Sequence, residues 1–139
     1  MKKFFLNCDG GSRGNPGPSA SGAVLFDADD VMVDERGEYL GIQTNNFAEY
    51  HAVIIGIQMA LEHGATELHI RLDSMLIVQQ MNGKYKIKAP NLAIKNAQIH
   101  ELLKKMDKFS FVHVYREHNK AADAMVNKVL DVQTGHKKR

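Results

Sequence analysis

Four carboxylates stand where one predicted element gives way to the next, and their positions are the first indication of chemistry. Each follows a strand or lies in the first turn of a helix; they are Asp9, Glu49, Asp73 and Asp123. Carboxylate oxygens are the ligands that hard divalent cations prefer. Each acid also has a structural explanation: Glu49 fits a capping box that begins at Asn46, Asp73 suits a helix N-cap, and Asp123 suits a helix N-terminus. The residue types alone leave both interpretations open.

The stretch after Asp9 is rich in glycine and turn-forming residues over positions 10–19. Glycine has no Cβ and tolerates positive φ, so such a loop lets a bulky ligand come close to the backbone. We interpret Asp9 and this loop as the anchor of an active site. The alternative is a plain turn, because Asp-Gly dipeptides commonly form hairpins.

Hydrophobic periodicity supplies the elements that must position these residues. Three short-linked strands predict an antiparallel meander, and a strand that follows the first helix favours parallel pairing through a crossover. The predicted order is βββαβααβα, an α/β fold in which helices pack on a mixed five-stranded sheet. The expected strands are 3–8, 20–26, 31–42 with an interruption near Gly37, 67–72 and 109–115, and the expected helices are 46–63, 74–81, 91–105 and 119–131.

Length and composition set the boundaries of this fold. The 139 residues, 44% of them hydrophobic, predict one domain over residues 1–131 and a basic, flexible tail over residues 132–139. The single cysteine, Cys8, cannot form an internal disulfide and agrees with a reducing compartment. No apolar run has the length of a signal-peptide core or a membrane span. We therefore expect a soluble, cytoplasmic protein with no membrane partner.

Charge is distributed unevenly along the chain. Residues 1–83 carry a net charge of −6, and residues 84–139 carry +8. This polarity suggests an acidic site beside a basic surface that could hold a polyanion, although a solvated lysine-rich face is the alternative. Lys84, Lys86 and Lys88 alternate along an extended connector, so they would share one side and could meet phosphates or only solvent.

Each acid also lies within a longer pattern, and together the four patterns resemble ribonuclease H of type 1. The similarity covers about residues 3–130, nearly the whole chain. The motifs are DGGSRGNPGP at residues 9–18, TNNFAEY at 44–50, LDS at 72–74 and NKAAD at 119–123. Many members insert a long basic protrusion with several tryptophans between the short and the next long helix. Here that region is only residues 84–90 and the chain has no tryptophan, so it resembles the variant without this handle.

The resemblance implies a ribonuclease H-like fold and a metal-dependent endoribonuclease, a phosphodiester hydrolase acting by a two-metal-ion mechanism. It would hydrolyse the RNA strand of RNA–DNA hybrids to 5′-phosphate and 3′-hydroxyl products as a monomer. Two Mg²⁺ ions, replaceable by Mn²⁺, would be held by the four acids. By resemblance Asp9 bridges both ions, Asp123 helps bind the ion that activates water, and Glu49 and Asp73 complete the site at the leaving group.

Substrate choice requires a sensor of the 2′-hydroxyl, which distinguishes RNA from DNA. In the family, the glycine-rich loop and a pair of asparagines read the minor groove of the hybrid. The implied contacts here are Gly11, Ser12, Arg13, Asn15, Asn45 and Asn46. Helix capping could also explain Asn45 and Asn46, and turn chemistry could explain Asn15.

Two further positions depart from the family pattern. Met75 stands where many members have a glutamine, and the segment before the last motif is the compact Arg116-Glu117-His118. Arg116 or His118 could assist the reaction by steering phosphate. Two alternatives to a hybrid-cutting enzyme remain at this level: a nucleic-acid-binding module of the same fold without turnover, and a nuclease with another duplex preference.

Overall fold

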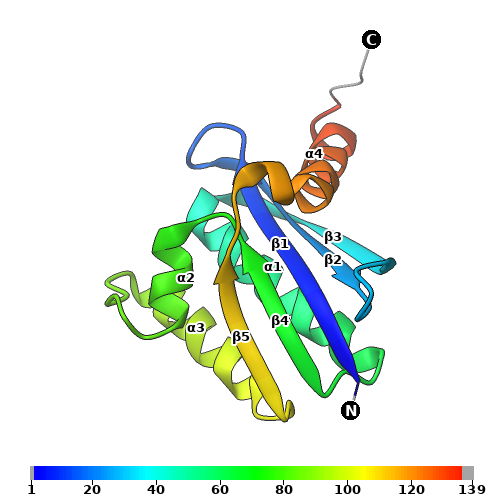
Figure 1. The fold of residues 1–139 in the computed structure, drawn as a ribbon. Helices are drawn as coiled ribbons and strands as arrows, with labels where there is room; N and C mark the ends of the chain where they lie inside the picture. Colours follow the sequence, from blue (N-terminus) through cyan, green and yellow to red (C-terminus); the bar gives the residue numbers. More distant parts are fainter. Residues whose placement is uncertain (1, 136–139) are drawn as a thin grey trace.

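The computed structural model describes residues 2–135, and its elements confirm the predicted order βββαβααβα (Figure 1). The strands are β1 (Lys3–Ser12), β2 (Gly17–Phe26), β3 (Met32–Gln43), β4 (Glu67–Leu72) and β5 (Lys108–His113). The helices are α1 (Asn45–Glu62), α2 (Met75–Met81), α3 (Pro90–Leu103) and α4 (Lys120–Thr134), with a 3₁₀ turn, η1, at Arg116–His118.

The sheet is mixed, with strand order β3-β2-β1-β4-β5. β1 pairs antiparallel with β2 and parallel with β4, β2 pairs antiparallel with β3, and β5 pairs parallel with β4. The central position of β1 places Asp9 beside the end of β4. Pairing between β1 and β4 stops at Asn7 and Arg71, so the two strands separate just before each delivers its acid.

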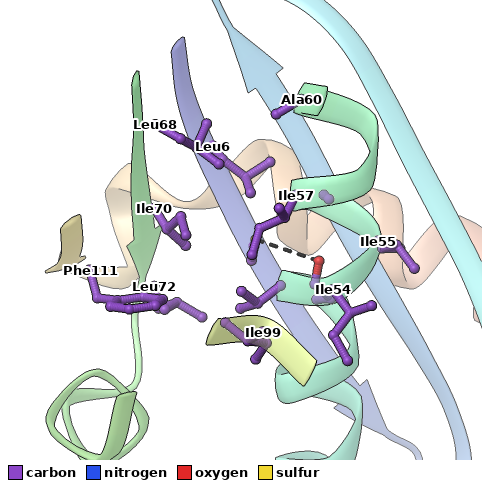
Figure 2. Close-up of a cluster of buried hydrophobic side chains, with 14 of the residues drawn as sticks. Leu6, Ile54, Ile55, Ile57, Ala60, Leu68, Ile70, Leu72, Ile99 and Phe111 are labelled. Atoms are coloured by element: carbon purple, nitrogen blue, oxygen red, sulfur yellow. Dashed lines mark hydrogen bonds between the residues drawn. The ribbon is translucent and has the colours of Figure 1, made fainter. Parts of the chain in front are cut away.

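The main core lies between the sheet and the layer of α1, α2 and α3, with α1 and α3 behind the sheet in the view of Figure 1. Leu6 of β1 and Ile70 of β4 are fully buried against Ile57 of α1, and Figure 2 shows these side chains together with Ile99 of α3. Burying a side chain of this size contributes about 1.5–3 kcal/mol. In β4, buried and half-buried residues alternate, so one face of this strand is turned toward the core.

On the opposite face of the sheet, α4 packs against β2, β1 and β3, near the end of the sheet where β1 ends (Figure 1). Its apolar residues form a small separate cluster in which Val126 and Leu130 pack against Ala20 of β2. The predicted interruption of the third strand near Gly37 was wrong, because β3 runs through that residue and pairs it with Gly22. A Cβ on Gly37 would lie 2.6 Å from Val129 of α4, so close helix packing explains the glycine.

The connection after Asp9 is shorter than expected. Strand β1 continues to Ser12 and β2 begins at Gly17, so only residues 13–16 join them. Gly10 belongs to β1, and a Cβ there would lie 2.2 Å from the backbone carbon of Ala48 in α1. This close contact between strand and helix brings Glu49 beside Asp9.

The last helix extends beyond its predicted end. Residues 132–134, expected in the tail, belong to α4, and Gly135 follows with φ 73°. A glycine in the left-handed region is a common helix terminator, which explains the later end. The remainder of the expected tail, residues 136–139, lies outside the described residues. No helix within residues 2–135 has both the length and the apolar character needed to cross a membrane.

Candidate active site

Three acids from three different elements converge at the end of the sheet where β1 and β4 separate. Asp9 comes from β1, Glu49 from α1, and Asp73 from the residue after β4. One carboxylate oxygen of each lies within 4.8 Å of the others. Asp123 of α4 joins them in lining a pocket of about 450 Å³. The pocket is lined by Asp9, Gly10, Asn45, Asn46, Glu49, Asp73, Ser74, Arg116 and Asp123.

Helix capping does not explain Glu49 or Asp73, because other residues cap α1 and α2. Thr44 is the N-cap of α1, and its hydroxyl accepts a hydrogen bond from the Phe47 backbone N–H at 3.2 Å. Ser74 is the N-cap of α2 and accepts from the Ile77 N–H at 3.3 Å. The capping explanations for Glu49 and Asp73 are therefore wrong. Asp123 does lie in the first turn of α4, where a negative charge is favourable.

Burial and mutual repulsion make the acidic group electrostatically costly when no cation is bound. Burial, together with the negative charges of Asp73 and Asp123, raises the pKa of Asp9 to about 7. Burial and repulsion from Asp9 and Asp73, opposed in part by the positive charge of Arg116, raise the pKa of Glu49 to about 8. A divalent cation would relieve this repulsion. An all-oxygen donor set fits a hard cation rather than zinc or copper.

Two of the asparagines expected to contact substrate hold the short loop against the start of α1. Asn45 accepts a hydrogen bond from the Ser12 backbone N–H through Oδ1 at 2.7 Å. The Asn45 N–H donates in turn to Oδ1 of Asn15 at 3.1 Å. The Oδ1 atoms of Asn15 and Asn45 thus accept hydrogen bonds within the protein, and their Nδ2 groups can donate to a ligand. Asn45 and the exposed Asn46 line the pocket. Gly11 is not among the lining residues, and a Cβ there would lie 3.4 Å from Val126 of α4.

The structure places Arg13 differently from the other expected substrate contacts. Its guanidinium binds Asp131 of α4 at 2.6 Å, with Thr134 Oγ1 at 3.3 Å. Arg13 is not among the residues that line the acidic pocket. The pair therefore fastens the loop to α4.

The two candidate auxiliary residues are the first and last residues of the turn η1. Arg116 lines the acidic pocket and is exposed. His118 is exposed and is not among the lining residues, while its backbone oxygen accepts from Asn7 Nδ2 at 3.1 Å. The geometry favours Arg116 over His118 as the group that can reach a ligand in the pocket.

The alternating lysines lie on an exposed connector without regular secondary structure. Lys84, Lys86 and Lys88 are all exposed, whereas Ile87 packs against the core. Anchoring at Ile87 turns its neighbours outward. Met75, at the start of α2, is 49% exposed and close in sequence to Asp73.

Sequence reasoning did not assign a role to two residues at the site. Ser74 lines the pocket, and its place beside Asp73 was the available signal. Asn119 is fully buried and donates a hydrogen bond to Asp73 at 3.3 Å. Asn119 is the first residue of the last motif, but nothing in the sequence indicated its partner.

Comparison with known proteins shows which family this chain resembles. A family model described as reverse transcriptase-like matches residues 7–129. Ribonuclease HI of Halobacterium salinarum is 42% identical over 123 residues, which is 88% of this chain and 62% of that protein. The chain thus spans less than two thirds of the length of that relative.

Two solved structures superimpose on this chain over nearly their whole length. The crystal structure of RNase H1 from Halobacterium salinarum superimposes with a TM-score of 0.91 at 40% identity, covering 94% of this chain and 98% of that one. LC11-RNase H1, solved in complex with an RNA/DNA hybrid, superimposes with a TM-score of 0.90 at 38% identity, covering 94% and 99%.

Proposed function

Since the chain belongs to the ribonuclease H type 1 family, we propose that it is an endoribonuclease that hydrolyses the RNA strand of RNA–DNA hybrids. The products would carry 5′-phosphate and 3′-hydroxyl ends. The observation that carries the proposal is the convergence of Asp9, Glu49, Asp73 and Asp123 in one pocket edged by Asn45 and Asn46. The complex of the similar LC11 enzyme with an RNA/DNA hybrid supports this choice of substrate.

The acids would hold two Mg²⁺ ions, with Mn²⁺ able to substitute. Such a pair supplies a water of lowered pKa and stabilises the leaving 3′ oxygen. Asp9 would hold both ions, because its carboxylate is close to all three other acids. It lies within 4.8 Å of those of Glu49 and Asp73, and it is near enough to Asp123 for that charge to raise its pKa. Glu49 and Asp73 would complete one site, and Asp123 the other. The all-carboxylate donor set supports a hard cation at these positions.

Neutral donors near the acids suit recognition of RNA. Asn15 and Asn45 offer Nδ2 groups, and Asn46 is exposed at the pocket. Donors of this kind match the 2′-hydroxyl oxygen and the acceptors of a minor groove. Gly11 and Ser12 would face the RNA strand. Arg116 would orient a phosphate oxygen at the pocket, and His118 is the weaker candidate for this role.

Basic residues outside the pocket would extend the binding surface. The exposed Lys84, Lys86 and Lys88 would meet phosphates of the hybrid in place of the missing handle. We also propose that the chain acts as a monomer in the cytoplasm. The buried single cysteine suits a reducing compartment.

Matched duplexes test the proposal directly. With Mg²⁺ present, we expect the protein to cut a labelled hybrid and to cut RNA and DNA duplexes of the same sequence far more slowly, because its neutral donors suit the 2′-hydroxyls of one strand. Cleavage products resolved on a denaturing gel give the measurement. No cleavage in either Mg²⁺ or Mn²⁺ would contradict the proposal. Tight hybrid binding without cleavage would favour a binding module, and faster cutting of another duplex would reassign the substrate.

The contact between Arg13 and Asp131 gives a prediction about substrate affinity. Arg13→Ala and Asp131→Asn should each raise KM for the hybrid by about two- to fivefold while kcat changes little. A partly exposed ion pair contributes at most about 1 kcal/mol, and its loss loosens the loop without touching the acids. Steady-state kinetics on both variants checks this. If Arg13 instead contacts phosphate directly, only Arg13→Ala will raise KM.

A further inference from the structure

We propose that Asn119 is a positioning residue that holds the acidic site in its metal-binding geometry. This inference rests on the proposed metal-dependent function. Asn119 immediately precedes α4 and is fully buried. Its Nδ2 group donates to the backbone oxygen of Cys8 at 2.9 Å and to Oδ2 of Asp73 at 3.3 Å.

These two hydrogen bonds cross the point where β1 and β4 separate. The last pair between the strands is Asn7 with Arg71, so Cys8 and Asp73 lie just beyond it. The Asn119 amide therefore links the two chain segments just beyond the last backbone pair. Cys8 directly precedes Asp9, so a contact to its carbonyl fixes the backbone that carries the proposed bridging acid.

Asn119 also connects to the fourth acid through the backbone. Its carbonyl oxygen accepts from the Asp123 N–H at 3.2 Å, which begins the hydrogen bonding of α4. One residue therefore touches the chain at three places that each deliver a carboxylate: beside Asp9, at Asp73 and at Asp123. The contacts join parts of the sequence that are 111 and 46 residues apart.

The side chain of Asn119 is not explained by a local structural role. It occupies the N-cap position of α4, where asparagine commonly accepts from the first turn, yet it makes no capping hydrogen bond. Its Oδ1 is buried and has no hydrogen-bond partner within residues 2–135. The reverse orientation of the amide would set Oδ1 against two acceptors, the Cys8 carbonyl and the Asp73 carboxylate. An unsatisfied oxygen is thus retained at a cost so that the two donors can face the site.

Loss of the two Asn119 hydrogen bonds should weaken metal binding more than it weakens substrate binding. Without the hydrogen bond, the Asp73 carboxylate can rotate, and the end of β1 can move away from β4. Groups that orient metal ligands typically change metal affinity by about 10- to 100-fold when they are removed. Asn119 is buried behind the acids, so the binding of the hybrid should change little.

Calorimetric titration of the protein with Mg²⁺, without nucleic acid, tests the role. We expect Asn119→Leu, which removes the donors in a side chain of similar shape, to weaken Mg²⁺ binding about 10- to 100-fold. Asn119→Ala serves as the second variant. The matched control is Asn96→Leu in α3, because Asn96 also has a buried oxygen without a partner in residues 2–135 and does not line the pocket. Kinetics should show kcat reduced at limiting Mg²⁺, partly restored by excess Mg²⁺, and a KM for the hybrid close to wild type.

A folded Asn119→Leu or Asn119→Ala protein that binds Mg²⁺ as tightly as wild type overturns the inference. If neither variant folds, the wild-type protein decides: the Asn119 side-chain amide NMR signal should shift on Mg²⁺ addition while that of Asn96 stays constant. An unchanged Asn119 signal would equally overturn the role. If the wild-type protein binds Mg²⁺ but cuts no hybrid, the proposed activity is wrong. The Mg²⁺ titration of the Asn119 variants still tests the positioning role in that case.

Discussion

Asp9→Asn should abolish hybrid cleavage and, in the absence of metal, make the protein more stable. The proposed bridging carboxylate contributes several kcal/mol to catalysis, so kcat should fall by about 10³-fold or more. The same substitution removes a buried charge that Asp73 and Asp123 repel. A pKa unit corresponds to about 1.4 kcal/mol, so a pKa of about 7 against an ordinary 3.8 predicts a gain on the order of 4 kcal/mol at a pH above that pKa.

Urea denaturation in EDTA at about pH 8 measures the stability, and a gel assay with Mg²⁺ measures the activity. Asp107→Asn is the matched control, since that acid is exposed and does not line the pocket. It should change neither quantity appreciably. A less stable Asp9→Asn protein in EDTA would show that repulsion within the acidic group is not the dominant force.

The metal-free wild-type protein should lose stability as the pH rises, and Mg²⁺ should restore it. The folded-state pKa values of Asp9 and Glu49, about 7 and about 8, lie above their ordinary values of 3.8 and 4.5. Between these limits the folded state binds more protons than the unfolded state. Stability therefore falls from about pH 4 to about pH 8 and then levels off.

Mg²⁺ binding should reverse this loss where the acids are ionised. An ion present at about 100 times its Kd adds about 2.7 kcal/mol. Thermal unfolding should therefore show a large rise in Tm with Mg²⁺ at about pH 8 and a small one at about pH 5. Glu49→Gln is the informative variant, because it should flatten the metal-free pH profile. A wild-type protein whose metal-free stability rises over this range, or a Glu49→Gln profile that matches wild type, would refute the explanation.

The sequence was sufficient to predict the element order and to select four acids that the structure places around one pocket. Apolar spacing predicted the strands and helices, and each acid lay in a motif long enough to identify the family. Caps were harder to assign, because Thr44, Asn45 and Asn46 can all act as an N-cap and only the backbone shows which one does. Sequence patterns specify residue types within one element, so they separate candidates poorly when neighbours share the same chemistry.

Contacts between distant segments could not be predicted. Arg13 was predicted to contact the substrate because it belongs to the glycine-rich loop. In the structure its guanidinium binds Asp131, which is 118 residues later in the chain. Gly37 resembled a break in a strand, but the space it leaves is taken by Val129 of α4. Asn119 is polar at a helix start, which fits a cap, and only its buried contacts reveal another role. Each case depends on how closely α4 approaches the sheet.

The separate packing of α4 has a consequence for biosynthesis. The main core is built from residues that precede this helix, whereas α4 attaches through its own small cluster around Val126 and Leu130. A nascent chain can therefore collapse around β1, β4 and α1 while Asn119 and Asp123 are still inside the ribosome. The proposed nuclease centre would be complete only after α4 has been translated, because a shorter nascent chain lacks Asp123. Such a chain would be unable to act on nucleic acid near the site of its own synthesis.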